Sequence, residues 1–220
     1  MKFKAVLFDF DGTLLPSLPL WVKAYHAALR HFGVTLPDSE IIARCFFRDL
    51  DEVASDLYGG TGESFRPRLD AALLEAFLEA RLFPLARPLL SHCRAHGLQT
   101  ALVTSSPRNL LAGVLPRLEL TALFDFVIAG DEVSRYKPHP EPVLTALAAL
   151  GREAHEAVMI GDSHADILAG KAAGTATALF LHDDHAPFHS FDALRATGPD
   201  VIFSDHQELP ALLGLPLLAV

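Results

Sequence analysis

The sequence has little cysteine and no long apolar run. Its 220 residues include only Cys45 and Cys93, in no metal-binding or disulfide spacing, so we expect two reduced thiols. Asp9 breaks the first apolar run too early for a signal peptide or a membrane span. The Leu-rich tail over residues 209–220 is short and interrupted by Pro216, which predicts a last helix facing the core. We therefore expect a cytoplasmic protein that does not engage a membrane.

Basic residues are outnumbered by acidic ones. Lysine and arginine total 18, aspartate and glutamate total 27, and the formal net charge is -9 at pH 7. General binding to nucleic acid requires a basic face that neutralises phosphates, so this class of partner is not expected. An anionic ligand would have to be captured by a few local groups. With 50% apolar residues, the chain can bury a full core, as one domain or as one domain with an insert.

Helical periodicity dominates the first third of the chain. It follows an apolar run at residues 3–8, which is typical of an interior strand of a covered sheet. No further strand is indicated before residue 83. The predicted helices of this block cover residues 20–32, 38–44, 48–58 and 64–81.

From residue 83 onward, strands and helices alternate, which predicts a parallel sheet with crossover helices. The predicted strands cover residues 99–104, 126–129, 157–161, 176–181 and 201–203. The expected fold is α/β: a doubly wound parallel sheet formed by residues 1–15 and 83–220, with the helical block 16–82 inserted as a separate domain.

Two carboxylates end the first predicted strand. Asp9 and Asp11 are one residue apart, so their side chains should face the same side until Gly12 turns the chain. The carboxyl end of a strand is where open α/β sheets bind ligands. Neighbouring carboxylates repel, and they coexist when a cation, a proton or different chemical roles separate them. A turn and a helix cap would also explain a short Asp-x-Asp string, so the pair needs support from elsewhere in the chain.

Polar residues also follow the later strands. Thr104 and Ser105 precede a helix, where unpaired N–H groups can bind phosphate, although an ordinary helix cap has the same residues. Lys137, in a proline-containing loop, can serve as a point charge for phosphate. Asp162 and Asp166 follow the predicted strand 157–161 and are one helical turn apart, and carboxylates suit Mg²⁺. Together these residues favour a phosphate and metal site over the separate local explanations.

These residues, in this order, resemble the four motifs of the haloacid dehalogenase-type hydrolase superfamily. The matching segments are Asp9-Phe10-Asp11-Gly12-Thr13, Thr104, Lys137 and Gly161-Asp162-Ser163-x-x-Asp166. The helical block between the first and second motifs resembles the branch with a helical cap, which includes phosphoglycolate phosphatase and β-phosphoglucomutase. The resemblance implies a Rossmann-like core with an inserted α-helical cap domain, and a small phosphorylated metabolite as substrate.

The resemblance implies a role for each residue that carries it. Asp9 would attack phosphorus and carry an aspartyl-phosphate. Asp11 would protonate the leaving alcohol and then deprotonate water. Thr104, Ser105 and Lys137 would hold the phosphoryl oxygens as charge spreads in the transition state.

The resemblance also implies a magnesium site. Asp9, the Asp11 carbonyl and Asp162 would hold Mg²⁺ together with the phosphate. Asp166 would orient Lys137 or a metal-bound water.

Several members of the superfamily remain to be compared. Asp11 argues against carbon–halogen cleavage, because the dehalogenases need neither the second acid nor the metal. The sugar-phosphate mutases of this branch have a histidine where this chain has Trp21, and commonly an aspartate where it has Pro16. The implied function is therefore a Mg²⁺-dependent, phosphoglycolate phosphatase-like phosphatase, with a β-phosphoglucomutase-like mutase as the alternative. A receiver-like, non-enzymatic phosphate-binding domain is a further alternative, and the chain could be a monomer or a homodimer.

Two polar segments have less certain roles. Arg44, Phe47 and Arg48 belong to the segment that joins two predicted cap helices, and this segment resembles the family's specificity loop in position. They could bind an anionic substrate with an apolar part, or they could be cap core and solvated rim. The histidines and aspartates over residues 182–189 lack the spacing of a metal site, so we expect a solvated loop there.

Overall fold

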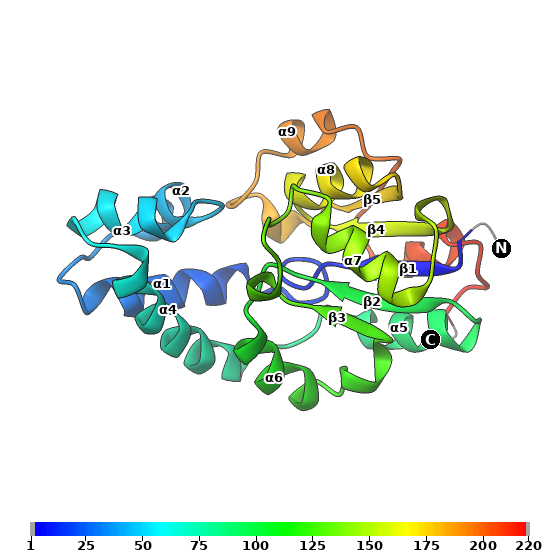
Figure 1. The fold of residues 1–220 in the computed structure, drawn as a ribbon, viewed down its shortest axis with the longest axis horizontal. Coiled ribbons are helices and arrows are strands. Elements are labelled where there is room, and N and C mark those ends of the chain that lie inside the picture. Colours follow the sequence, from blue (N-terminus) through cyan, green and yellow to red (C-terminus); the bar gives the residue numbers. More distant parts are fainter. Residues whose placement is uncertain (1–2, 219–220) are drawn as a thin grey trace. The chain divides into compact units, whose positions relative to one another are not determined.

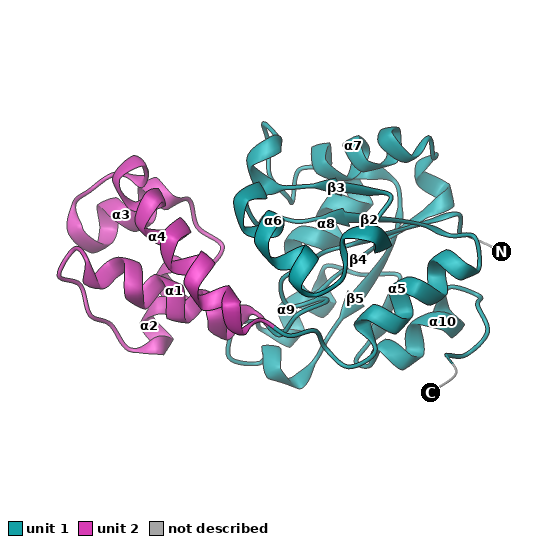
Figure 2. Cartoon of the chain, turned by 90° about the horizontal axis from the view of Figure 1, so that it is seen from below, with its two compact units in different colours: residues 1–16, 81–220 teal, residues 17–80 magenta. Residues whose placement is uncertain are grey.

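The computed structural model describes residues 3–218, and Figure 1 shows its elements along the chain. The chain divides into two compact units, which Figure 2 colours separately. The core unit comprises Met1–Pro16 and Arg81–Val220, and the cap unit is Ser17–Ala80. The insert expected from the sequence, 16–82, starts one residue earlier and ends two residues later than the cap unit.

The core unit is built on a sheet of parallel strands in the order β3-β2-β1-β4-β5-β6. The strands are β1 (Ala5–Phe8), β2 (Gln99–Val103), β3 (Phe126–Ile128), β4 (Ala157–Gly161), β5 (Ala176–Phe180) and β6 (Val201–Phe203). Every residue of β1 is buried, as expected of an interior strand. Phe8 pairs with Leu102 on one side and with Ile160 on the other, so the carboxyl ends of β1, β2 and β4 meet at one edge. The predicted doubly wound parallel sheet is confirmed.

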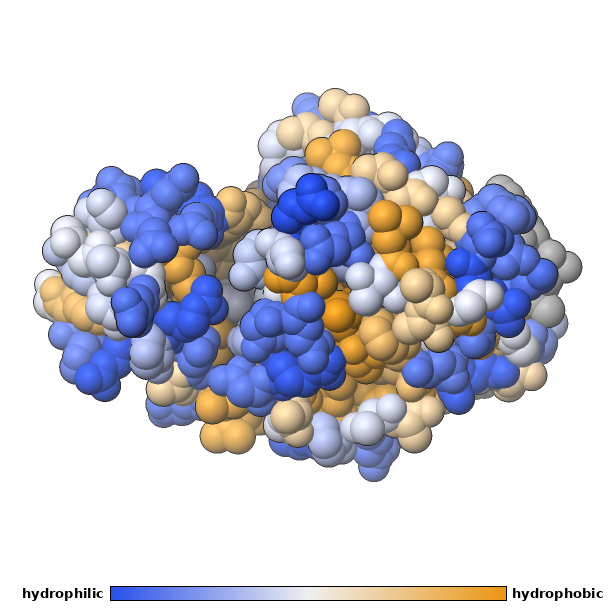
Figure 3. Space-filling view, viewed as in Figure 1, coloured by the Kyte–Doolittle hydropathy of each residue, from blue (hydrophilic) through white to orange (hydrophobic). Residues whose placement is uncertain are grey.

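Helices cover both faces of this sheet (Figure 2). On one face, α7 (Glu141–Leu150) and α8 (His164–Ala173) join apolar residues of the strands in a buried cluster. On the other face, α5 (Ala86–Ala95) packs against β2, and α10 (Leu209–Leu212) lies beside α5. The remaining helices of the core unit are α6 (Arg108–Arg117) and α9 (Phe191–Ala196). Figure 3 shows apolar residues gathered around the edge of the sheet where β3 lies.

The cap unit is helical. Its helices are α1 (Leu18–Arg30), α2 (Asp38–Cys45), α3 (Leu50–Tyr58) and α4 (Gly62–Ala76), followed by the 3₁₀ turn Phe77–Glu79. The Asp49 side chain accepts a hydrogen bond from the first turn of α3, and Thr61 forms a capping box with Ser64 at the start of α4. The rings of Tyr25 and Phe65 stack with centroids 6.2 Å apart, which ties α1 to α4.

The C-terminal tail is shorter as a helix than the sequence predicts. α10 ends at Leu212, because Gly214 adopts a φ of +70° in the left-handed region. Leu213 is buried but Leu217 is 73% exposed, so only part of the tail faces the core. Residues 219–220 of the predicted helix lie outside the described residues. Among the helices that the structure describes, none is long and apolar enough to cross a membrane.

Candidate active site

Asp9 follows directly on the last residue of β1. Its N–H donates to the carbonyl of Ile160 at 2.8 Å, which ties the residue to β4. The chain then turns at Gly12, which has a φ of +77°. A Cβ at Gly12 would lie 2.1 Å from Oδ2 of Asp162, so both the conformation and the space require glycine. This close approach brings the end of β1 against the end of β4.

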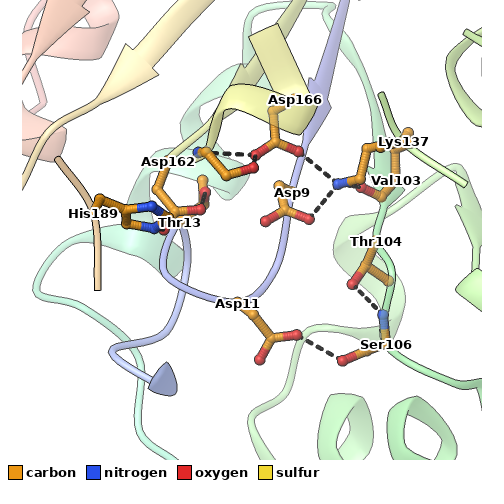
Figure 4. A network of polar contacts seen from close by, with 11 residues as sticks. Asp9, Asp11, Thr13, Val103, Thr104, Ser106, Lys137, Asp162, Asp166 and His189 are labelled. Atoms are coloured by element: carbon orange, nitrogen blue, oxygen red, sulfur yellow. Dashed lines mark hydrogen bonds and ion pairs between the residues drawn. The ribbon is translucent and has the colours of Figure 1, made fainter. Parts of the chain in front are cut away.

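Lys137 lies between two buried carboxylates (Figure 4). Its Nζ donates to Oδ1 of Asp9 at 2.6 Å, to Oδ1 of Asp166 at 2.6 Å and to the carbonyl of Val103 at 2.8 Å. Burial opposes the charged form of the amine, but the carboxylates of Asp166 and Asp9 outweigh it and hold the pKa of Lys137 above its ordinary value. The ammonium group of Lys137 is therefore fixed between the ends of β1 and β2.

Asp166 is held by the start of α8. The N–H and Oγ of Ser163 donate to Oδ2 of Asp166 at 3.1 and 2.6 Å. A Cβ at Gly161 would lie 2.2 Å from Cγ of Asp166, so the strand end must be glycine for the carboxylate to fit. Both oxygens of Asp166 are thus engaged, one by Ser163 and one by Lys137. This arrangement suits a group that orients Lys137 better than a metal ligand.

Three carboxylates of the site lie close to one another. Oxygens of Asp9, Asp162 and Asp166 lie within 4.8 Å of one another, and all three residues are buried. Burial, reinforced by the charge of Asp166, raises the pKa of Asp9 well above its usual range, and burial likewise raises the pKa of Asp162. Oδ2 of Asp162 makes no hydrogen bond within residues 3–218. One lysine does not balance three acids, so the charge and the open acceptor fit a hard divalent ion.

β2 leads into the turn where the sequence places phosphate-binding groups. Thr104 is buried, and its Oγ1 accepts a hydrogen bond from the N–H of Ser106 at 3.0 Å, whereas Ser105 is exposed. The Oγ of Ser106 donates to Oδ2 of Asp11 at 2.6 Å (Figure 4). Asp11 lies beyond the end of β1, in the turn at Gly12. The alternation of side chains along a strand therefore does not determine the direction of its side chain. In the sequence, Ser106 is marked only by its place two residues after Thr104.

The stretch 182–189 corrects one expectation. The sequence predicts a solvated loop, but His185 is 2% exposed and the side chain of His189 is 4% exposed. Nε2 of His189 lies 3.3 Å from Oδ2 of Asp162, and Nδ1 of His185 lies 4.0 Å from the same oxygen. Burial and the neighbouring imidazoles lower the pKa of His185 to about 4. The prediction is wrong for these two residues because the loop folds back onto the end of β4, a long-range contact that local polarity does not reveal.

The candidate specificity residues lie in the last turn of α2, for Arg44, and in the turn between α2 and α3, for Phe47 and Arg48. Arg44 and Arg48 both pair with Oδ2 of Asp56, at 3.3 and 3.2 Å. Phe47 is 56% exposed and adopts a φ of +57°, which is strained for a side chain of this size. Within the cap unit, the two arginines are therefore charge-paired and Phe47 is presented outward.

The parallel core, the helical insert and the acids around a buried lysine fit a hydrolase that acts on phosphate esters. Residues 6–180 match the family model of the haloacid dehalogenase-like hydrolases, and the chain belongs to this family. It is 30% identical over 230 residues to the phosphoglycolate phosphatase of Yersinia pestis, covering 99% of this chain and 97% of that protein.

Solved structures share the fold over nearly the whole chain. A putative β-phosphoglucomutase from Thermotoga maritima has a TM-score of 0.77 and 26% identity, covering 96% of this chain and 99% of that chain. A haloacid dehalogenase family hydrolase from Deinococcus radiodurans, solved with bound phosphate and sodium, has a TM-score of 0.78 and 28% identity, covering 97% and 96%. The predicted family and fold are confirmed, and the chain is a phosphatase.

Proposed function

We propose that this phosphatase hydrolyses a small phosphate monoester through an aspartyl-phosphate on Asp9, with Mg²⁺ as cofactor. The observation that carries the proposal is the position of Lys137, whose Nζ lies 2.6 Å from both Asp9 and Asp166 in a buried site. A carboxylate must be ionised to attack phosphorus, and the lysine favours the ionised form against the burial that opposes it. The name of the Yersinia relative makes phosphoglycolate, a small phosphorylated acid, the first substrate to test.

In the first half-reaction, an oxygen of Asp9 attacks phosphorus and the bond from phosphorus to the leaving alcohol breaks. Asp11 transfers its proton to the leaving oxygen, so the alcohol departs neutral. Thr104, Lys137 and the backbone N–H groups around Ser105 hold the phosphoryl oxygens, where the charge spreads in the transition state.

In the second half-reaction, water attacks phosphorus and the bond to Asp9 breaks. Asp11, now ionised, takes a proton from the water, and the products are phosphate and the free Asp9 carboxylate. The hydrogen bond from Oγ of Ser106 to Oδ2 of Asp11, 2.6 Å long, would restrain this carboxyl group in both steps.

Mg²⁺ would be held by Asp9, Asp162 and the backbone carbonyl of Asp11. It would neutralise charge on the phosphate and relieve the repulsion among the buried acids. Asp166 would orient Lys137, because both of its oxygens already accept hydrogen bonds.

A sugar-phosphate mutase is the second candidate, because the Thermotoga neighbour is a putative β-phosphoglucomutase. The position of the mutases' histidine is occupied here by Trp21. Its ring packs against Phe77 and Tyr25, with centroids 6.2 and 6.3 Å apart. An indole has no group that titrates near neutral pH and so cannot act as a general acid or base, which supports the phosphatase.

The test is a screen of phosphorylated metabolites, including phosphoglycolate and hexose phosphates, with Mg²⁺ present and released phosphate as the readout. Chelation by EDTA should abolish turnover, and added Mg²⁺ should restore it. Isomerised hexose phosphate without phosphate release would favour the mutase. Full activity in metal-free buffer would contradict the proposed cofactor.

A further inference from the structure

His189 lies beside Asp162 in the core unit, and the two half-reactions described above do not use it. Its Nε2 lies 3.3 Å from Oδ2 of Asp162, and the two side chains are 4% and 3% exposed. Figure 4 shows the imidazole facing Asp162 on the side away from Lys137. The imidazole of His189 is thus buried against Asp162, which the proposed function makes a ligand of Mg²⁺.

Among residues 3–218, few other groups hold the Asp162 carboxylate. Lys137 pairs with Asp9 and Asp166 instead. The hydroxyl of Thr13 donates to Oδ1 of Asp162 at 3.4 Å, which is long for a hydrogen bond. At Oδ2, the imidazole of His189 is closer than that of the other nearby histidine, at 3.3 against 4.0 Å.

The loop that carries His189 is anchored on both sides. The N–H of His189 donates to the carbonyl of His185 at 3.0 Å, and the two rings meet edge to face with centroids 6.1 Å apart. On the other side, Ser190 caps α9, and Leu194 of that helix is buried in an apolar cluster with residues of α8 and β5. The imidazole is therefore held in place before any ligand binds.

We propose that His189 is a positioning residue for Asp162: the contact between its Nε2 and Oδ2, 3.3 Å apart, holds the carboxylate in the orientation that binds the divalent cation. This inference rests on the proposed cation requirement. A carboxylate that is already oriented loses less side-chain freedom when it binds a metal. Removing such an outer partner of a metal ligand costs about 10–100-fold in metal affinity.

The test measures cation binding without turnover. Mn²⁺ is titrated into the substrate-free full chain, and free Mn²⁺ is measured by electron paramagnetic resonance. We expect His189→Ala to raise the dissociation constant about 10–100-fold. His189→Gln keeps an N–H donor of similar reach and should bind within about threefold of the wild type.

The control is His182→Ala, which removes a partly exposed histidine from the same loop and should leave Mn²⁺ binding unchanged. Thermal midpoints for all variants show whether the loop remains folded. Equal or tighter Mn²⁺ binding by His189→Ala would overturn the inference, as would His189→Gln binding as weakly as His189→Ala. Failure of the proposed function gives a different result, because the wild type itself would then bind no Mn²⁺ and Asp162→Asn would change nothing.

Discussion

The candidate catalytic residues of the core unit form a buried ion pair, whereas the candidate specificity residues of the cap unit form ion pairs that are open to solvent. The side chain of Lys137 is 4% exposed and that of its partner Asp9 is 9% exposed, whereas the values for Arg48 and Asp56 are 32% and 44%. A buried pair that loses one partner leaves an uncompensated charge, while water and salt screen an exposed pair. Substitutions in the core should therefore affect every substrate strongly. Substitutions in the cap can discriminate only through the part of the substrate that varies.

The largest effect is expected from Asp9→Asn. The substitution keeps the shape of the side chain and removes the nucleophile, so phosphate release should fall at least about 10³-fold for every substrate. We expect the fold to survive, because Lys137 keeps its contact with Asp166 at 2.6 Å. Steady-state phosphate release and circular dichroism check the two halves of this expectation.

The matched control is Asp56→Asn in the cap unit, which also turns an ion-paired aspartate into asparagine. It should leave the turnover of p-nitrophenyl phosphate unchanged. If folded Asp9→Asn were as active as Asp56→Asn, the aspartyl-phosphate mechanism would have to be abandoned.

Much of the fold could be predicted because its elements follow local rules. The run of apolar residues before Asp9 and the alternation after residue 83 give the sheet, and observed strand ends differ from the predicted ones by a residue or two. Parallel strands bring their carboxyl ends to one edge, and the segments that follow these ends carry Asp9, Lys137 and Asp166 into contact. The tail was predicted less well, since the left-handed turn at Gly214 ends α10 after a single turn.

Parts of the site depend on contacts that the sequence does not display. Ser105 and Ser106 are adjacent and chemically identical, and only the turn decides that Ser106 is buried against Asp11. His185 and His189 lie in a stretch whose local composition is that of a solvated loop. Their burial comes from packing across the molecule against the end of β4, which no spacing pattern encodes.

The next largest effect concerns the proton-transfer group. Asp11→Asn should slow both half-reactions, by about 10²–10⁴-fold, since one carboxyl group serves as acid and then as base. Ser106→Ala keeps that carboxyl group but removes its 2.6 Å hydrogen bond, and a smaller loss of about tenfold is expected. Single-turnover kinetics would show whether formation and hydrolysis of the intermediate slow together. Wild-type rates in Ser106→Ala would show that Asp11 needs no such support.

A third prediction concerns pH and stability in the core unit. Burial lowers the pKa of His206 to about 4, and its Nε2 lies 3.0 Å from the carbonyl of Thr13. The unfolded chain therefore binds more protons at this position between pH 6.5 and 4, so its contribution to stability is lost as pH falls through that window. Urea unfolding at pH 7.5 and 5 should show that the wild type loses about 2 kcal/mol more than His206→Gln.

The glutamine can still donate to the Thr13 carbonyl, so this variant removes the titration and keeps the contact. His155 is exposed in the same unit, and His155→Gln should lose as much stability as the wild type over this pH range. Identical losses in the wild type and His206→Gln would show that the buried imidazole does not set the acid sensitivity.

The smallest and most selective effect is expected in the cap unit. Arg48→Ala removes a guanidinium paired with Asp56 and Glu52 at the surface, so the thermal midpoint should not change. We expect KM for the physiological ester to rise about tenfold and KM for p-nitrophenyl phosphate to stay unchanged, because a cap residue can select only the leaving group. Arg68→Ala removes another exposed arginine of the cap unit and should alter neither constant. Proportional losses for both esters, or no change for either, would mean that Arg48 only forms ion pairs within the cap unit and does not contact the substrate. Specificity would then have to come from another part of the cap, with the exposed Phe47 as the first candidate.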